Sequence, residues 1–293
     1  MFIVRNRAVF YSISGILCVA ALVALFAWGL KPGIDFTGGS IVEVAYDNAS
    51  STRPVVTAES LGLEGASIRE TGSNGFIIRA KELTPEEHNT LLAELGNPVE
   101  KRFDSVGPIL GKEALQKSWM SIGLVLLAIV LFITFVFRRV SRPVSSWKYG
   151  LIAIVGLAHN ILIAAGAFAL FGHLFGFEID TLFVTALLVI LGFSIHDTIV
   201  VFDRVRENLR DDSKGRKAFD ELVGESVRAT FVRSVNTSLT TLLAIVVLYL
   251  VGPEATKHFS LALAIGIAAG TYSSIFLCSP LLVSAFKWQG GNK

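Results

Sequence analysis

The sequence predicts a polytopic α-helical membrane protein: six transmembrane helices, with one α/β, ferredoxin-like extracytoplasmic domain between helices 1 and 2. Hydrophobic residues make up 52% of the 293 residues and charged residues only 17%. The charges also lie between long apolar runs instead of being spread evenly. A helix needs about 20 mostly apolar residues to cross a hydrocarbon core of about 30 Å. The segments that meet this requirement are 8–30, 119–137, 149–171, 181–202, 235–251 and 259–286.

Three of these spans have individual features. The first could be a signal peptide, but its apolar run is too long and no small-residue cleavage site follows it, so we expect an uncleaved anchor. The fifth span is short, which places its polar start, Asn236-Thr237-Ser238, inside the membrane. The last span is long enough to tilt, and Pro280 is expected to kink or end it.

The distribution of Lys and Arg over the short loops predicts the orientation. The N-terminal segment and the loops after the second and fourth spans are basic, whereas 173–180 contains no Lys or Arg and 252–258 only Lys257. Both termini are therefore expected in the cytoplasm and residues 31–117 outside it. The basic residues are Arg5, Arg7, Arg138, Arg139, Arg142, Lys148, Arg204, Arg206, Arg210, Lys214, Arg216, Lys217, Arg228 and Arg233.

The outside segment, 31–117, has the pattern of a small α/β domain. Four strands are expected, at 40–47, 66–71, 75–81 and 99–106, with a turn at Gly72-Ser73-Asn74 between the second and third. A helix is expected to begin at Thr84-Pro85-Glu86-Glu87 and to run to about Leu95, and a short helix is expected over 58–63. This order is typical of a split-βαβ, ferredoxin-like layer. With no catalytic cluster, we expect a binding or positioning module.

The cytoplasmic loop 203–234 is predicted to carry an amphipathic helix that begins near Arg216 and leads into the fifth span. Two interpretations are open: an anchor on the membrane surface, or a lever that couples spans four and five. The apolar positions of this helix are Phe219, Leu222, Val223, Val227 and Phe231.

Asp197 is the most informative polar residue, because a carboxylate inside a membrane span is costly and marks a functional site by default. Counting along the span places it roughly 9 Å to the cytoplasmic side of the midplane. Two interpretations follow: a proton or ion relay, or a structural ion pair. Arg233, at the start of span five, is its natural partner, although it could instead extend to the headgroups.

Other polar residues in the spans have alternative interpretations. His196 adjoins Asp197 but points about 100° away on a helix, so it could serve the relay or be a packing histidine. The same alternatives apply to His159 and Asn160 in span three, and Thr237, Ser238, Thr240 and Thr241 could line a polar path in span five. We expect no metal site, no disulfide between Cys18 and Cys278, and no nucleic-acid partner at a net charge of +2.

Two long motifs carry a resemblance to a known family. Asp35-Phe36-Thr37-Gly38-Gly39 follows the first span, and the run from Asp197 through Asp203, Arg204, Arg206, Glu207 and Asn208 ends the fourth. Val106-Gly107-Pro108 and the segment 233–241 also fit. Over essentially its whole length the chain resembles the SecD/SecF family, and one modest outside domain is similar to the SecF branch. Two residues depart from the family pattern: His196 replaces the common Asn, and Asn160 replaces the common Asp.

The resemblance implies an accessory subunit of the Sec protein translocase in the bacterial cytoplasmic (inner) membrane, and no enzyme. Its implied partners are SecD, the SecYEG channel, SecA, YajC and secreted preproteins. The family is similar to RND exporters, needs no cofactor, and uses a proton gradient or, in some members, sodium. Asp197 would be its membrane carboxylate, Arg233 the basic partner, and the turn at Gly38-Gly39 a hinge or simply a tight turn. Two other functions stay open: an RND-type small-molecule exporter half acting as an oligomer, and a passive assembly subunit.

Overall fold

The computed structural model describes residues 2–46, 66–71, 75–136, 145–212 and 216–288. They form two compact units: Pro32–Met120, and Met1–Lys31 together with Ser121–Lys293. The first is the small α/β domain and the second is a helix bundle.

The bundle contains long apolar helices that begin after a short turn, α1 (Phe2–Arg5). Among the described residues, six helices are long and apolar enough to cross a membrane, which confirms the predicted number. They are α2 (Arg7–Trp28), α5 (Pro108–Val136), α6 (Ser146–Phe175), α7 (Thr181–Asp211), α8 (Phe219–Val251), and a last one that consists of α9 (Glu254–Tyr272), η1 (Ser273–Cys278) and α10 (Ser279–Trp288).

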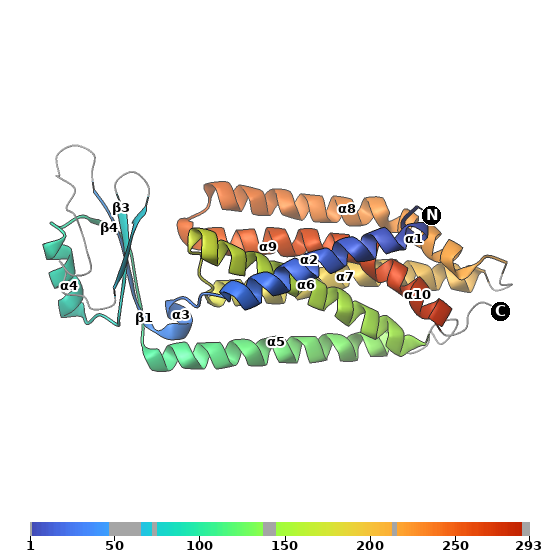
Figure 1. The fold of residues 1–293 in the computed structure, drawn as a ribbon, viewed down its shortest axis with the longest axis horizontal. Helices are drawn as coiled ribbons and strands as arrows, with labels where there is room; N and C mark the ends of the chain where they lie inside the picture. The colour runs from blue at the N-terminus through green and yellow to red at the C-terminus, as the bar shows by residue number, and fades with distance from the viewer. Residues whose placement is uncertain (1, 47–65, 72–74, 137–144, 213–215, 289–293) are drawn as a thin grey trace. The chain divides into compact units, whose positions relative to one another are not determined.

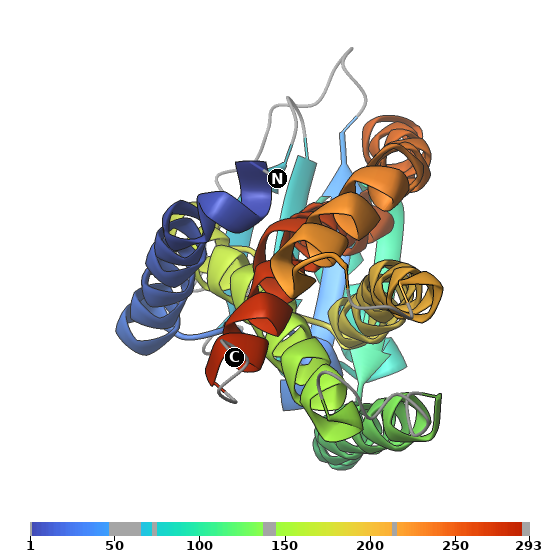
Figure 2. The same cartoon turned by 90° about the vertical axis from the view of Figure 1, so that its right-hand side faces the viewer.

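The last helix occupies the middle of the bundle. It packs against α2, α6, α7 and α8, and Figure 2 shows α9 and α10 in the centre of the end-on view. Small residues permit the close approaches that membrane helices need. At Gly166 in α6, an added Cβ would overlap the backbone of Ala21 in α2, and at Gly266 in α9 it would overlap the side chain of Ile190. Figure 1 places α1 and α10 at the same end of the bundle.

Pro280 neither ends the last helix nor begins a loop. The helix continues to Trp288, and the six residues Ser273–Cys278 before the proline form a π-helical segment. Proline lacks a backbone N–H and its ring crowds the carbonyl of the preceding turn, so widening that turn accommodates it. Ser279 Oγ donates to the Ser274 carbonyl at 2.8 Å, which supplies a hydrogen bond inside the widened turn.

The amphipathic segment and the fifth span are one continuous helix, α8, instead of a surface helix followed by a span. Its apolar face is buried: Phe219, Val223 and Val227 belong to the same core cluster as Phe202 and Leu282. Phe231, the last of the predicted apolar positions, stays exposed. The anchor on the membrane surface and the lever between spans four and five both stay predictions. Helix α7 likewise continues past the fourth span to Asp211.

The small domain has a four-stranded antiparallel sheet in the order β2-β3-β1-β4. The strands are β1 (Gly39–Ala45), β2 (Ser67–Thr71), β3 (Gly75–Ala80) and β4 (Val99–Val106), and α4 (Pro85–Glu94) connects β3 with β4. This order is that of a ferredoxin-like layer, as predicted. The helix expected over 58–63 and the turn at 72–74 lie outside the described residues. Alternate residues of β1 and β3 form the core with α4: Val42, Val44, Phe76, Ile78, Leu83, Leu91 and Leu95.

Two hydroxyl side chains fix the local geometry of this domain. Thr84 caps α4 in a capping box, in which its hydroxyl accepts from the Glu87 N–H and the Glu87 carboxylate accepts from the Thr84 N–H. Ser40 at the start of β1 is fully buried, accepts from the Leu83 N–H at 2.9 Å, and lies 2.8 Å from the Ser105 hydroxyl of β4. These contacts connect β1 with both the segment before α4 and the last strand.

Candidate functional site

Asp197 lies inside the helix bundle, on the face of α7 that packs against α8 and α9. Only 2% of the residue is exposed, and it is the only buried Asp or Glu within the described residues. His196, the next residue on the helix, is exposed instead. Since successive helical residues point about 100° apart, the two side chains occupy different environments, as their spacing predicted.

Two hydroxyls from neighbouring helices extend from the Asp197 carboxylate. Ser238 of α8 donates to Asp197 Oδ2 at 3.4 Å. Thr271 of α9 lies with its Oγ1 2.6 Å from Ser238 Oγ and 2.9 Å from the Ile267 carbonyl. The carboxylate, Ser238 and Thr271 therefore form a short polar chain across three packed helices.

Arg233, the predicted partner, does not touch Asp197. No ion pair within 4.0 Å joins them in the part of the chain that the structure describes, and Arg233 is exposed at its position on α8. Arg233 lies on a different face of α8 from Ser238, so of the two arrangements expected for Arg233 the structure has the one without a direct pair.

Of the hydroxyls in the predicted polar path, Ser238 alone donates to Asp197 within the described part of the chain. Thr240 donates to the carbonyls of Asn236 and Thr237 in its own helix, and Thr241 also donates to that of Thr237. Such bonds satisfy a hydroxyl inside a membrane helix without any partner from another helix. Thr271 is not among the site residues predicted from the sequence. Span six nevertheless carries a cluster of polar residues, Thr271 to Ser274, which indicates a polar contact between helices.

A second polar cluster lies between α6, α7 and α9. His159 Nδ1 lies 3.0 Å from Asn160 Oδ1, and both residues are buried. Gly270 of α9 is so close that an added Cβ would overlap Ser194 Oγ and lie 3.6 Å from Asn160 Nδ2. His159 and Asn160 of α6 therefore face α9, the helix that also carries Thr271. Within the described ranges, no group of three or more His, Cys, Asp or Glu could hold a metal ion.

The motif after the first span forms a tight connection into the domain. Ile34–Thr37 is a single helical turn (α3) that buries Phe36, and Gly38 and Gly39 follow with φ of 76° and 127°. A Cβ on Gly38 would lie 2.7 Å from Pro108 Cα, and one on Gly39 would lie 2.7 Å from the Ala80 carbonyl oxygen. Both positions thus require glycine for backbone conformation and for space. Asp35 lies in the first turn of α3 and is half-buried.

The motif after the fourth span is a continuation of α7. Arg204 pairs with Glu207, and Arg206 pairs with Asp203 at 3.4 Å. Asn208 reaches the neighbouring helix, where its Nδ2 donates to Ser226 Oγ of α8 at 2.7 Å. Ser226 is fully buried, so this bond joins the ends of α7 and α8 on the side of the bundle that carries α1 and α10.

Comparison with known families identifies the chain. Residues 87–288 match the model of the protein export membrane protein SecD/SecF, C-terminal, and residues 23–50 match that of the SecD/SecF GG motif. The chain belongs to the SecD/SecF family. The second match covers the turn at Gly38-Gly39, and the first covers Asp197 and the helices around it. Six spanning helices within this family make it an integral membrane protein.

Individual relatives agree over nearly the whole length. The chain is 42% identical to the protein translocase subunit SecF of Thermobaculum terrenum, over 96% of this chain and 93% of the relative. It is 34% identical to that of Anaerolinea thermophila, over 99% and 94%. Among solved structures, SecDF from Thermus thermophilus, a translocon-associated membrane protein, matches 98% of this chain with a TM-score of 0.81 and 30% identity. The chain spans 38% of that SecDF chain.

Proposed function

We propose that the chain is an accessory subunit of the Sec protein translocase, which uses the proton gradient across the bacterial inner membrane to promote export of unfolded preproteins. The observation that carries the proposal is the buried Asp197 and its hydroxyl chain through Ser238 to Thr271. The names of its relatives support the translocase part of the proposal.

The arrangement suits a group that gains and loses a proton. A buried carboxylate is costly when charged, and here the short-range partner is a neutral hydroxyl and not a cation. Ser and Thr hydroxyls can each donate and accept, so the hydrogen bonds from Asp197 through Ser238 to Thr271 can reverse direction when Asp197 is protonated. Since these hydrogen bonds join α7, α8 and α9, a change in the charge of Asp197 alters contacts among three helices.

The gradient supplies enough free energy for such a rearrangement. Moving one charge across 100 mV is worth about 2.3 kcal/mol, so a few protons suffice to shift an equilibrium between two arrangements of the helices. Sodium could replace the proton as the coupling ion. The movement would reach the outside domain through α2 and the turn at Gly38-Gly39, which connects them along the chain.

A SecD-like subunit is the proposed partner, because the matched SecDF chain is more than twice as long and contains further structure beside the matched part. SecYEG, SecA and YajC complete the proposed assembly, with the preprotein as the substrate. The excess of Lys and Arg in the N-terminal segment and the loops after spans two and four supports cytoplasmic termini and a domain outside. We propose no enzymatic reaction and no cofactor.

The deciding experiment compares Asp197→Asn with Asp203→Asn in vesicles that contain the chain, its SecD-like partner, SecYEG and SecA. Asp203 is an exposed carboxylate less than two turns further along α7, so it is a matched control. We expect Asp197→Asn to lose the stimulation of export by the gradient while ATP-driven export and co-purification with the partner persist. Asp203→Asn should retain the stimulation.

Other outcomes would identify the alternatives. Normal gradient-driven export by Asp197→Asn would make the chain a passive assembly subunit. Purification as a homodimer without a different six-helix partner would instead favour an exporter half.

A further inference from the structure

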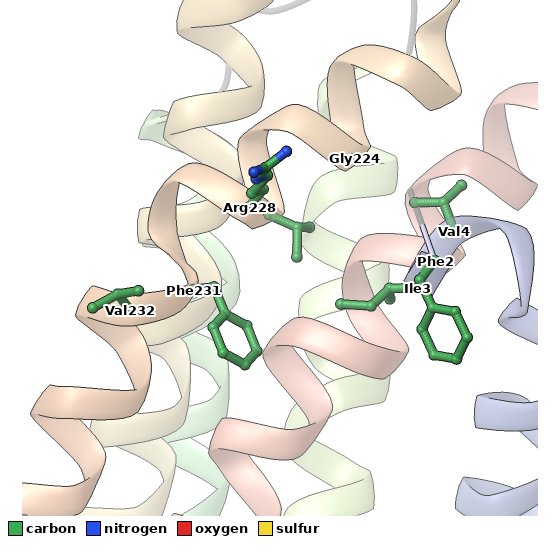
Figure 3. A pocket seen from close by; sticks show the side chains of 8 residues that line it. Phe2, Ile3, Val4, Gly224, Arg228, Phe231 and Val232 are labelled. Atoms are coloured by element: carbon green, nitrogen blue, oxygen red, sulfur yellow. The ribbon is translucent and has the colours of Figure 1, made fainter.

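A groove lies between the first residues of the chain and the beginning of α8. Its volume is about 380 Å³, within the range of sites that hold small ligands. In Figure 3 the side chains of α1 face those of α8 across the open space. The groove is lined by Phe2, Ile3, Val4, Gly224, Val227, Arg228, Phe231 and Val232.

The groove has a buried floor and exposed apolar walls. Val4 and Val227 are 6% and 3% exposed and belong to the core of the bundle. Phe2, Phe231 and Val232 remain 68%, 38% and 65% exposed, although they stand on helices packed against that core. Phe231 and Val232 lie on α8 just before the expected fifth span, 235–251, so these exposed apolar side chains are suited to an alkyl chain at the membrane surface.

Basic side chains line the groove and the hollow beside it. In Figure 3 the Arg228 guanidinium and the Phe231 ring both extend from α8, on the wall of the groove that faces α1, and they point in different directions. A second hollow shares Val4 with the groove and is lined further by Arg5, Arg7, Asp220 and Lys287. Its carboxylate, Asp220, lies 4.0 Å from Lys287. In the described part of the chain, Arg5, Arg7 and Arg228 make no ion pair, so three arginines are available to an anion.

We propose that this groove binds an anionic phospholipid, with an acyl chain against Val227, Phe231 and Val232 and the phosphate beside Arg228, Arg5 and Arg7. The ligand follows from the combination of features: an apolar cleft beside α8, next to three arginines that make no ion pair among the described residues. Arginine recognises phosphate by paired hydrogen bonds, and each basic residue near an anionic membrane surface adds to lipid binding. The lipid would hold α1 against α8 at the end of the bundle where Asn208 joins α7 to α8.

The test uses the full chain purified in detergent and equilibrated with phosphatidylglycerol or with phosphatidylcholine of the same acyl chains. Native mass spectrometry then counts the retained lipid. We expect the wild type to retain phosphatidylglycerol preferentially, and Arg228→Gln to lower that retention roughly fivefold without changing retention of phosphatidylcholine. Phe231→Ala should lower retention of both lipids, because it removes a wall of the groove. A photoreactive phosphatidylglycerol should label peptides that contain Phe2–Val4 or Gly224–Val232.

Arg210→Gln is the matched control, since Arg210 is an exposed arginine in the last turn of α7 and does not line the groove. It should retain lipid as the wild type does, and all variants should keep the wild-type unfolding temperature. Equal retention of the two lipids by the wild type, equal effects of Arg228→Gln and Arg210→Gln, or labelling elsewhere would overturn the proposal. So would efficient cross-linking of Val232→Cys to a partner subunit or to a second copy, because a protein would then occupy the groove.

Discussion

The Ser238 hydroxyl donates to the buried carboxylate of Asp197 and lies 2.6 Å from the Thr271 hydroxyl. Ser238 is therefore the residue through which three helices share one polar chain. We expect Ser238→Ala to reduce gradient-driven export by roughly tenfold, as expected for the loss of a hydrogen bond to a charged group. ATP-driven export should be unchanged. Export from vesicles with and without a gradient measures both quantities.

Ser234→Ala is the control for this variant. Ser234 is buried one turn earlier on the same helix and its Oγ has no hydrogen-bond partner in the structure, so both substitutions remove a buried hydroxyl from α8. If both variants impair gradient-driven export equally, the contact with Asp197 has no special role. Ser238→Thr keeps the hydroxyl and should restore most of the activity.

The sequence identifies Asp197 because a carboxylate in an apolar span stands out whatever the fold. It does not identify the contacts, since these depend on how each helix is rotated about its axis. Arg233 and Ser238 are five residues apart on α8, and a rotation decides which of them faces α7; in the structure it is Ser238. Thr271 is more than thirty residues further along, on a helix whose position next to α8 no local pattern specifies.

The turn at Gly38-Gly39 gives a prediction about the stability of the outside domain. Gly39→Ala forces a non-glycine residue to φ of 127° and places its Cβ 2.7 Å from the Ala80 carbonyl oxygen. The conformational strain alone costs roughly 1–3 kcal/mol, and the overlap with the backbone of Ala80, which cannot move freely, adds to it. We expect the domain of Gly39→Ala to become susceptible to protease at a lower temperature than that of the wild type.

Gly96→Ala separates the two causes in the same domain. Gly96 has φ of 80° but nothing within 4 Å of an added Cβ. It should therefore show the conformational strain without the overlap, and lower the temperature of proteolysis less than Gly39→Ala does. An equal effect of the two substitutions would mean that the approach of Ala80 is unimportant.

Helix packing around the second polar cluster can be tested at Gly270. Gly270→Ala places a methyl group on Ser194 Oγ, at a position where α7 and α9 are in close contact. Overpacking of this kind costs roughly 1–3 kcal/mol, so the unfolding temperature of the purified chain should fall. Gly123→Ala is the comparison, because its added Cβ has nothing within 4 Å, and it should leave that temperature almost unchanged.

The sequence predicts where the helices and strands lie better than it predicts which neighbouring segments join into one continuous helix. The spans and strands follow from apolar runs and alternation, both of which are local. That 219–251 is one helix is less evident, because its polar first half and apolar second half have different patterns although the backbone continues through both. The π-helical segment Ser273–Cys278 has a local cause, Pro280, but whether proline ends, bends or widens a helix depends on what packs around it.

The cap of α4 gives the last prediction, which concerns pH. Hydrogen bonds from the backbone and the side chain of Thr84 hold the pKa of the Glu87 carboxyl below its ordinary value. A carboxyl whose pKa is lowered in the folded state stabilises that state above the ordinary value, and this contribution is lost as the pH falls through the folded value. Thr84→Ala removes the side-chain bond to the Glu87 carboxylate, which depends on the charge of Glu87, and the bond from the Glu87 N–H, which does not. It should therefore destabilise α4 at neutral pH, and the difference in unfolding temperature from the wild type should narrow at strongly acidic pH without disappearing. Thr90→Ala, which removes an exposed hydroxyl that bonds only to the Glu86 carbonyl, should show no such dependence. Protease susceptibility of the domain against temperature, measured with an acid-active and a neutral protease, gives both comparisons; a difference between Thr84→Ala and the wild type that stays constant with pH would contradict the assignment.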